Sequence, residues 1–191
     1  MSADPADPKA VDRILLIGMM GAGKTTVGHA LSKRLGWPYL DNDELLARAV
    51  GKDTRRVQQE DGVAALRHDE SLALAAALAE PPPVIAGVAA GVVTDPADRE
   101  RLRTGGYVVW LRADLHTLAR RVRGTDRPWL GDEPEQALRE LYAGRAELYA
   151  EVASLVVDVD DTTPLATADR IVAAIPSRSP GAASPTSHPS G

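Results

Sequence analysis

The segment Gly18–Thr25, GMMGAGKT, places glycines, a lysine and a threonine at the spacing G-x-x-x-x-G-K-[ST]. It follows the apolar run Ile14–Ile17 and opens a helical pattern. Glycines let several backbone N–H groups converge on a phosphate, and the helix N-terminus adds the positive end of its dipole. We therefore expect bound ATP, with Lys24 reaching the β- and γ-phosphates and Thr25 giving its hydroxyl to Mg²⁺. The residues expected to hold the nucleotide in this segment are Gly21, Ala22, Gly23, Lys24, Thr25 and Thr26.

Two carboxylates follow the short run Pro38–Leu40. We expect them at the carboxyl end of a strand that lies beside the first strand, where the ligands of open α/β sheets collect. Asp41 is then placed to hold a water of the Mg²⁺ shell. Asp43 faces the same side if the chain stays extended, and it could accept a proton from a substrate hydroxyl. The alternative is that one aspartate N-caps the next helix, and the two roles can coexist.

Short apolar runs alternate with longer helical patterns along the chain. The strands are expected at Ile14–Ile17, Pro38–Leu40, Val84–Ala86, Tyr107–Leu111 and Leu155–Asp158. The helices are expected at Lys24–Leu35, Asp43–Val50, Thr54–Glu80 with a break near Gly62, Leu115–Val122, Pro134–Ala153 and Ala166–Ile175. Because the strands are continuously apolar, the pattern predicts an α/β fold, a five-stranded parallel sheet between two helical layers (three-layer α/β/α).

Composition limits the classes of function. A chain of 191 residues with 44% hydrophobic residues supports one domain, expected over residues 11–176, and the polar tails 1–10 and 177–191 are expected to be disordered. The absence of cysteine excludes disulfides and thiolate metal sites and is compatible with the cytoplasm. A net charge of -5 argues against nucleic acid, and no apolar run approaches the length of a membrane span. We expect a monomer with a small-molecule substrate.

Residues 123–133 interrupt the alternation with two glycines, a proline, a tryptophan and two arginines, Arg123 and Arg127. This composition indicates a mobile lid, and the alternative is an ordinary connection of unusual length between two helices.

Several segments in the same order resemble the shikimate kinases, small P-loop kinases, over about Arg13–Ile175. They are GMMGAGKTTVGHALSKRLGWPYLDNDELL with its D-x-D, GKDTRRVQQEDGVAALRHDE, TDP-x-x-R, VVWL, RPWL and GRAELYAEVA. The resemblance implies an enzyme that uses ATP and Mg²⁺ to phosphorylate the 3-hydroxyl of shikimate.

The resemblance also implies roles for individual residues. Asp43 matches the aspartate that binds the substrate hydroxyls and activates the attacking one, and Arg67 and Arg145 match the arginines that hold the substrate carboxylate. Arg127 matches the lid arginine that closes over the transferring phosphoryl group, and Arg121 lies near the position that packs on adenine. Guanidinium forks suit a carboxylate chemically. From the residues alone, Arg67 and Arg145 would be read as a solvated helix face.

The segment Val84–Val93, VIAGVAAGVV, departs from the family, which has three consecutive glycines after its third strand. Gly91 is the residue of this loop that we expect to contact the substrate. Alanine restricts the backbone conformations and close approaches that glycine allows. Two alternatives therefore stay open: a kinase for a related acid such as aminoshikimate or gluconate, and a nucleotide-binding homologue without turnover.

Overall fold

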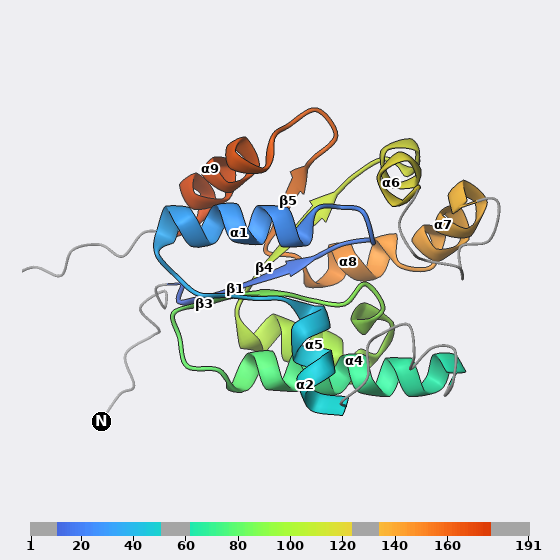
Figure 1. Cartoon of the computed structure of the whole chain (residues 1–191), viewed down its shortest axis with the longest axis horizontal. Helices are drawn as coiled ribbons and strands as arrows, with labels where there is room; N and C mark the ends of the chain where they lie inside the picture. Colours follow the sequence, from blue (N-terminus) through green and yellow to red (C-terminus); the bar gives the residue numbers. More distant parts are fainter. Residues whose placement is uncertain (1–10, 51–61, 124–133, 177–191) are drawn as a thin grey trace, which may run out of the picture.

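A parallel sheet of five strands forms the centre of the molecule (Figure 1). The computed structural model describes residues 11–50, 62–123 and 134–176. The strands are β1 (Arg13–Ile17), β2 (Tyr39–Leu40), β3 (Val84–Gly87), β4 (Tyr107–Arg112) and β5 (Leu155–Asp158), and their spatial order is β2-β3-β1-β4-β5. All four neighbouring pairs are parallel, which confirms the predicted sheet. The strand that precedes Asp41 was expected beside β1, and this was wrong, because β3 lies between them.

Helices cover both faces of the sheet, which confirms the three-layer architecture (Figure 1). On one face lie α1 (Lys24–Leu35) and α9 (Pro164–Ala174), and on the other lie α4 (Gly62–Ala79), α5 (Pro96–Gly105) and α8 (Ala146–Val152). The helix α2 (Asn42–Val50) packs on α4, and α6 (Leu115–Val122) packs on α7 (Pro134–Ala143). A short 3₁₀ helix, η1 (Val92–Thr94), follows β3.

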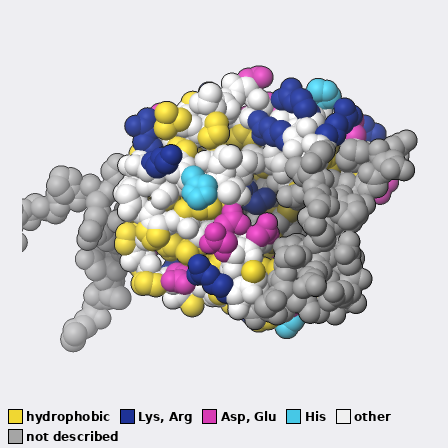
Figure 2. Space-filling view, viewed as in Figure 1, with side chains coloured by type: hydrophobic (Ala, Val, Ile, Leu, Met, Phe, Trp, Pro, Cys, Tyr) yellow, Lys and Arg dark blue, Asp and Glu magenta, His cyan; other side chains and the backbone are white. Residues whose placement is uncertain are grey.

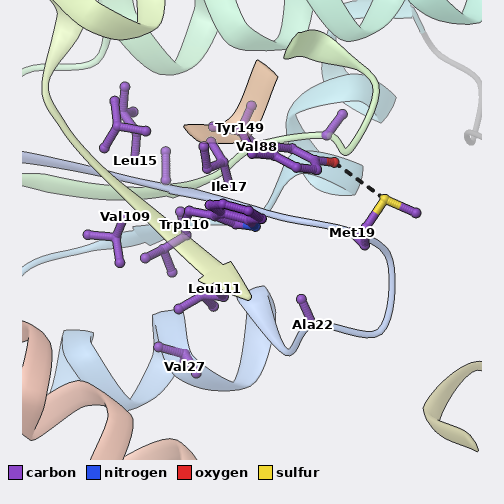
Figure 3. Close-up of a cluster of buried hydrophobic side chains, with 14 of the residues drawn as sticks. Leu15, Ile17, Met19, Ala22, Val27, Val88, Val109, Trp110, Leu111 and Tyr149 are labelled. Atoms are coloured by element: carbon purple, nitrogen blue, oxygen red, sulfur yellow. Dashed lines mark hydrogen bonds between the residues drawn. The ribbon is translucent and has the colours of Figure 1, made fainter. Parts of the chain in front are cut away.

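The core is built from the strands and from two aromatic rings that meet beneath them. The side chains of Ile14–Ile17 in the central strand β1 are almost fully buried, as expected for a strand covered on both faces. Trp110 of β4 stacks on Tyr149 of α8 with ring centroids 5.6 Å apart (Figure 3). Tyr149 has no exposed surface, so α8 is joined to the sheet through its largest side chain.

Two helical regions differ from the sequence-based prediction. One helix was expected over Pro134–Ala153, but the chain turns at Gly144 and Arg145 and forms α7 and α8. The helix α5 was not predicted because it has no apolar stripe, and its buried residues are only Asp98 and Leu102. The sequence nonetheless contains a signal for the start of α5. Asp95 accepts hydrogen bonds from N–H groups of the first turn of this helix, and a proline occupies the next position.

Several predictions concern residues outside the described ranges. They include both tails, the part of the predicted helix before Gly62, and residues 124–133, which form nearly all of the predicted lid. Across the described ranges, no helix combines the length and the apolar character that crossing a membrane requires.

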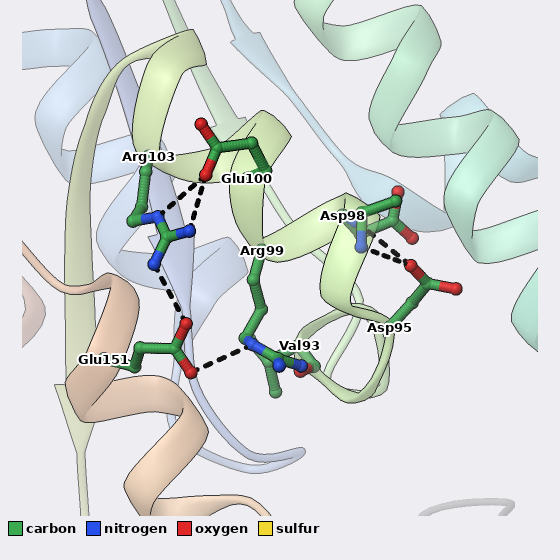
Figure 4. Close-up of polar contacts among 8 residues, drawn as sticks. Val93, Asp95, Asp98, Arg99, Glu100, Arg103 and Glu151 are labelled. Atoms are coloured by element: carbon green, nitrogen blue, oxygen red, sulfur yellow. Dashed lines mark hydrogen bonds and ion pairs between the residues drawn. The ribbon is translucent and has the colours of Figure 1, made fainter.

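A network of charged side chains joins α5 to α8 (Figure 4). Arg99 pairs with Glu151 at 3.0 Å and donates to the backbone carbonyl of Val93 in η1 at 2.8 Å. Arg103 also pairs with Glu151, at 3.0 Å, from the more exposed side. Through Arg99, the helix α8 and the segment that follows β3 are held by one guanidinium group.

The close contact of α1 with β2 generates a stability prediction. A Cβ atom at Gly28 would lie 2.1 Å from the ring of Tyr39, whose hydroxyl is itself hydrogen-bonded. Gly28→Ala should therefore lower the free energy of unfolding by roughly 1–2 kcal/mol, because overpacking outweighs the gain in helix propensity. Gly144→Ala is the matched control, since nothing lies within 4 Å of the added Cβ. Urea denaturation measures both, and equal stabilities would contradict the prediction.

Candidate functional site

The phosphate loop, residues 18–25, curls at glycines and ends at the start of α1. Gly21 and Gly23 have φ values of 80° and 93°, a region that side-chain-bearing residues rarely adopt. Gly23 is the N-cap of α1, so the first N–H groups of the helix are not capped by a side chain there. The Lys24 ammonium donates to the carbonyl of Gly18 at 2.8 Å and to that of Met19 at 3.2 Å. Backbone amides, a helix dipole and an ammonium group thus meet at one place, as phosphate binding requires.

The remaining predicted nucleotide residues also border this place. Ala22 donates its N–H to the carbonyl of Met19 at 3.2 Å, which closes the loop on itself. The Thr26 hydroxyl donates to the carbonyl of Gly23 at 3.0 Å. Both residues line the same cavity as Lys24 and Thr25.

The Asp41 carboxylate joins three segments of the chain. One oxygen accepts hydrogen bonds from the Thr25 hydroxyl at 2.9 Å and from the Tyr39 hydroxyl at 3.2 Å. The other accepts from the N–H of Asp43 at 2.9 Å. Asp41 therefore caps α2, as one of the two alternatives proposed, and its carboxylate also reaches the phosphate loop. Its role toward Mg²⁺ stays a prediction. Burial and the Asp41 charge raise the pKa of Tyr39, which keeps its hydroxyl neutral and able to donate.

Asp43 lies in the first turn of α2, so the chain is not extended between the two aspartates as we had supposed. The helix nevertheless leaves the Asp43 side chain exposed and lining the cavity. In the space-filling view, acidic side chains gather between α1 and α2 on this face (Figure 2).

One cavity of about 980 Å³ runs from the phosphate loop to the buried end of α8. Its lining includes every described residue to which we assigned a binding or catalytic role. These are Gly21, Ala22, Gly23, Lys24, Thr25, Thr26, Asp41, Asp43, Arg67, Gly91, Arg121 and Arg145. Arg127 lies outside the described residues.

Arg67 and Glu70 form an ion pair on one side of α4. Glu70 is buried, and burial raises the pKa of its carboxyl group although the Arg67 guanidinium lowers it. The pair lies flat against the backbone of Gly91, where an added Cβ would be 1.6 Å from a guanidinium nitrogen of Arg67. Gly91 is therefore required for the space it leaves, and its φ of −89° is an ordinary value.

Arg145 reaches the cavity from the break between α7 and α8. It is the N-cap residue of α8 and only 5% exposed. Burial lowers the pKa of its guanidinium, and the positive charge of Arg67 nearby acts in the same direction. Two guanidinium groups at one end of a cavity make a site for a carboxylate, which each of them can bind through two hydrogen bonds.

The β3–η1 loop, residues 88–91, accommodates its alanines without strain. Throughout the described ranges, residues other than glycine have no positive φ, and Gly87 and Gly91 also lie outside that region. What glycine supplies here is space: a Cβ at Gly87 would lie 2.5 Å from the Tyr39 hydroxyl. Ala89 and Ala90 carry their Cβ atoms at positions that line the cavity. The alanines therefore impose no backbone strain in this loop, and its approach to the substrate stays a prediction.

Arg121 links the phosphate loop to the segment after β5. It donates to the carbonyl of Gly21 at 3.3 Å and to the carbonyl of Val159 at 2.8 Å. The neighbouring Arg120 and Arg123 are exposed and do not line the cavity, so of these three arginines Arg121 is the one that borders it.

Sequence reasoning missed three residues of the site. Glu70 is three residues after Arg67, and Tyr149 is four residues after Arg145, so helical spacing was an available signal for both. Tyr39 carries no such signal, because its hydroxyl meets Asp41 only once β2 and the start of α2 are folded.

Comparisons with known proteins agree with this geometry. The sequence profile of the family described as "Shikimate kinase" matches residues 20–176. A shikimate kinase of Ruegeria pomeroyi is 38% identical over 167 residues, covering 86% of this chain and 85% of the relative. One from Streptomyces coelicolor is 40% identical over 152 residues, 79% of this chain and 88% of the relative. A solved shikimate kinase from Acinetobacter baumannii in complex with shikimate superposes with a TM-score of 0.80 at 32% identity, covering 85% of this chain and 91% of that one.

Proposed function

The chain belongs to the shikimate kinase family, and from that premise we propose that its own residues transfer the terminal phosphoryl group of ATP to the 3-hydroxyl of shikimate. The products are shikimate 3-phosphate and ADP. The observation that carries the proposal is one cavity lined by the phosphate loop, the Asp43 carboxylate, and the guanidinium groups of Arg67 and Arg145. The enzyme is a phosphotransferase with an alcohol acceptor.

The nucleotide end of the cavity is suited to ATP with Mg²⁺, which the family uses. The Thr25 hydroxyl and the Asp41 carboxylate lie 2.9 Å apart, and oxygen donors of these two kinds are the ones that Mg²⁺ prefers. When bound, Mg²⁺ neutralises charge on the phosphate oxygens. Lys24 supplies a second positive charge to the γ-phosphoryl group, and the amides of Gly21–Thr26 bind the remaining phosphate oxygens.

At the acceptor end, Arg67 and Arg145 bind the substrate carboxylate and so orient the ring. Asp43 accepts the proton of the 3-hydroxyl while the hydroxyl oxygen of the substrate bonds to the γ-phosphorus. The bond between the γ-phosphorus and ADP breaks in the same step. Gly91 lets Arg67 lie close to the β3–η1 loop. These are the roles that the family resemblance implies, and they are supported by the presence of all four side chains or backbones in the lining of a single cavity.

Two further arginines complete the proposal. Arg127, in the predicted lid, would approach the transferring phosphoryl group on closure and stabilise its charge. Arg121, fixed to the phosphate loop and to Val159, packs against the adenine. The monomeric state and the cytoplasmic location stay predictions.

The altered glycine loop had kept other acceptors open, and the relatives named shikimate kinase, one of them solved with shikimate, favour shikimate over them. The backbone at Ala89 and Ala90 needs no positive φ, and Gly91 keeps its place against Arg67. The same observation weakens the alternative of a homologue without turnover, because the alanines leave a continuous cavity.

A panel of acceptors tests the function directly. In a coupled assay of ADP release with ATP and Mg²⁺, shikimate should give a kcat/KM at least about tenfold above aminoshikimate and gluconate, since both arginines and Asp43 are matched to it. A higher kcat/KM for aminoshikimate or gluconate would identify that compound as the acceptor instead of shikimate. ADP binding in calorimetry without turnover on any of the three would indicate a non-catalytic protein.

Asp43→Asn tests the proposed base. The amide is similar in shape but cannot accept the hydroxyl proton, so kcat should fall roughly 10²- to 10⁴-fold. The Kd for ADP, measured by calorimetry, should stay within about twofold of that of the unmodified enzyme. Asp69→Asn, on a helix residue outside the cavity lining, is the matched control and should keep its turnover. Turnover retained by Asp43→Asn would refute the role of this residue.

Gly91→Ala tests the contact between the loop and Arg67. The added methyl group would occupy the position of the guanidinium, so Arg67 must move, and the KM for shikimate should rise on the order of 100-fold. Nucleotide binding lies at the other end of the cavity and should be unchanged. Gly144→Ala, with open space around its Cβ, makes the same chemical change without a clash. Steady-state kinetics with each substrate varied in turn distinguishes the outcomes.

A further inference from the structure

The hydroxyl of Tyr149 is a buried polar group that the mechanism above does not use. It donates a hydrogen bond to the backbone carbonyl of Ala90 at 2.7 Å, and it lies 3.7 Å from the sulfur of Met19 in the phosphate loop (Figure 3). A phenol has one proton, so the short contact to the carbonyl takes it and the thioether makes a weak contact. The β3–η1 loop is thus held to α8 by a side chain with no exposed surface.

Tyr149 also lies beside Arg145. It is one helical turn further along α8, and its N–H donates to the Arg145 carbonyl at 2.8 Å. Burial lowers the pKa of Arg145, and the nearby Tyr149 side chain acts in the opposite direction. The phenol therefore lies near the guanidinium, while its proton is given to the Ala90 carbonyl.

Gly91 links the loop that Tyr149 holds to the side chain of Arg67. Ala90 is held by Tyr149, and the next residue, Gly91, lies against Arg67. A Cβ added at Gly91 would lie 1.6 Å from a guanidinium nitrogen of Arg67. The position of the Ala90 carbonyl relative to α8 consequently sets the position of Arg67 relative to Arg145. These two guanidinium groups come from different helices and have no direct bond between them to fix their separation.

Tyr149 is held in place by contacts of α8 with the sheet and with α5. Its ring stacks on Trp110 of the sheet, and Glu151, two residues further along α8, is paired with Arg99 and Arg103 of α5 (Figure 4). Arg99 also holds the carbonyl of Val93, just beyond the β3–η1 loop. The loop is therefore attached to α8 at Ala90, and the η1 segment is attached to Arg99 of α5 at Val93.

We propose that Tyr149 is a positioning residue for the acceptor: its hydroxyl fixes the Ala90 carbonyl beside Arg145 and so sets the spacing at which Arg67 and Arg145 grip one carboxylate. The inference rests on the proposed function and adds the device that makes the two arginines act as one site. It assigns no contact with the reacting atoms to Tyr149.

Tyr149→Phe removes the hydroxyl and keeps the stacked ring. The KM for shikimate should rise roughly 5- to 100-fold, because the buried Ala90 carbonyl loses its partner and the loop is released from α8. The Kd for ADP should stay within about twofold. Tyr107→Phe is the matched control: it removes a hydroxyl that also donates to a backbone carbonyl, that of Ala174 at 3.4 Å, away from the cavity lining.

A double-mutant cycle separates positioning from packing. In an Arg145→Lys background, Tyr149→Phe should raise the KM for shikimate much less than it does alone, since the group that it positions has already been replaced. If Tyr149 had a purely structural role, the fold-increase in KM of the double variant would equal the product of the fold-increases of the two single variants. If Tyr149→Phe is unstable alone, saturating ADP and Mg²⁺ hold the native state by mass action, and shikimate is titrated in that complex.

The outcomes distinguish this inference from the function on which it rests. Without shikimate-dependent ADP release by the unmodified enzyme, the proposed function fails and the inference with it. If the unmodified enzyme turns over shikimate and Tyr149→Phe leaves its KM within about twofold, or if the two substitutions act independently, the positioning role alone is overturned.

Discussion

A parallel sheet brings the carboxyl ends of all its strands to one edge, and the site of this protein depends on that constraint. The phosphate loop follows β1, Asp41 and Asp43 follow β2, and the β3–η1 loop follows β3. Because β3 lies between β1 and β2, the loop that carries Gly91 leaves the sheet between the strands that precede the phosphate loop and the aspartates. The sheet thus determines which parts of the reaction face each other before any side chain is considered.

Close contact between backbone and side chain determines the finer placement. Tyr39 fills the space left by Gly28 and Gly87, and Arg67 fills the space beside Gly91. At these positions glycine is required because another group needs the volume of a methyl. Residues 89 and 90 are alanines where the family has glycines, and both line an open cavity.

Buried charge at the acceptor end has to be offset within the protein. Glu70 and Arg145 are both nearly inaccessible, and burial shifts the pKa of each toward its neutral form. Arg67 pairs with Glu70, and the Tyr149 oxygen acts on Arg145 in the opposite direction to burial. A substrate carboxylate adds a negative charge beside Arg67 and Arg145, which share Glu70 as an acidic neighbour in the part of the chain that the structure describes. Electrostatic balance therefore favours an anionic acceptor.

The sequence alone determined the phosphate loop, the five parallel strands and the candidate arginines, because these depend on local spacing, apolar periodicity and recurring segments. It could not determine that β3 separates β1 from β2, since strand order depends on packing between distant segments. It missed α5 because that helix is polar and is held by an N-cap and ion pairs instead of an apolar stripe. The tertiary structure alone decided that Arg121 and not its neighbours lines the cavity, that Asp41 bridges Thr25 and Tyr39, and that Tyr149 joins Ala90 to α8. These contacts join residues up to 100 positions apart, and only the folded packing of strands and helices brings such residues within hydrogen-bonding distance.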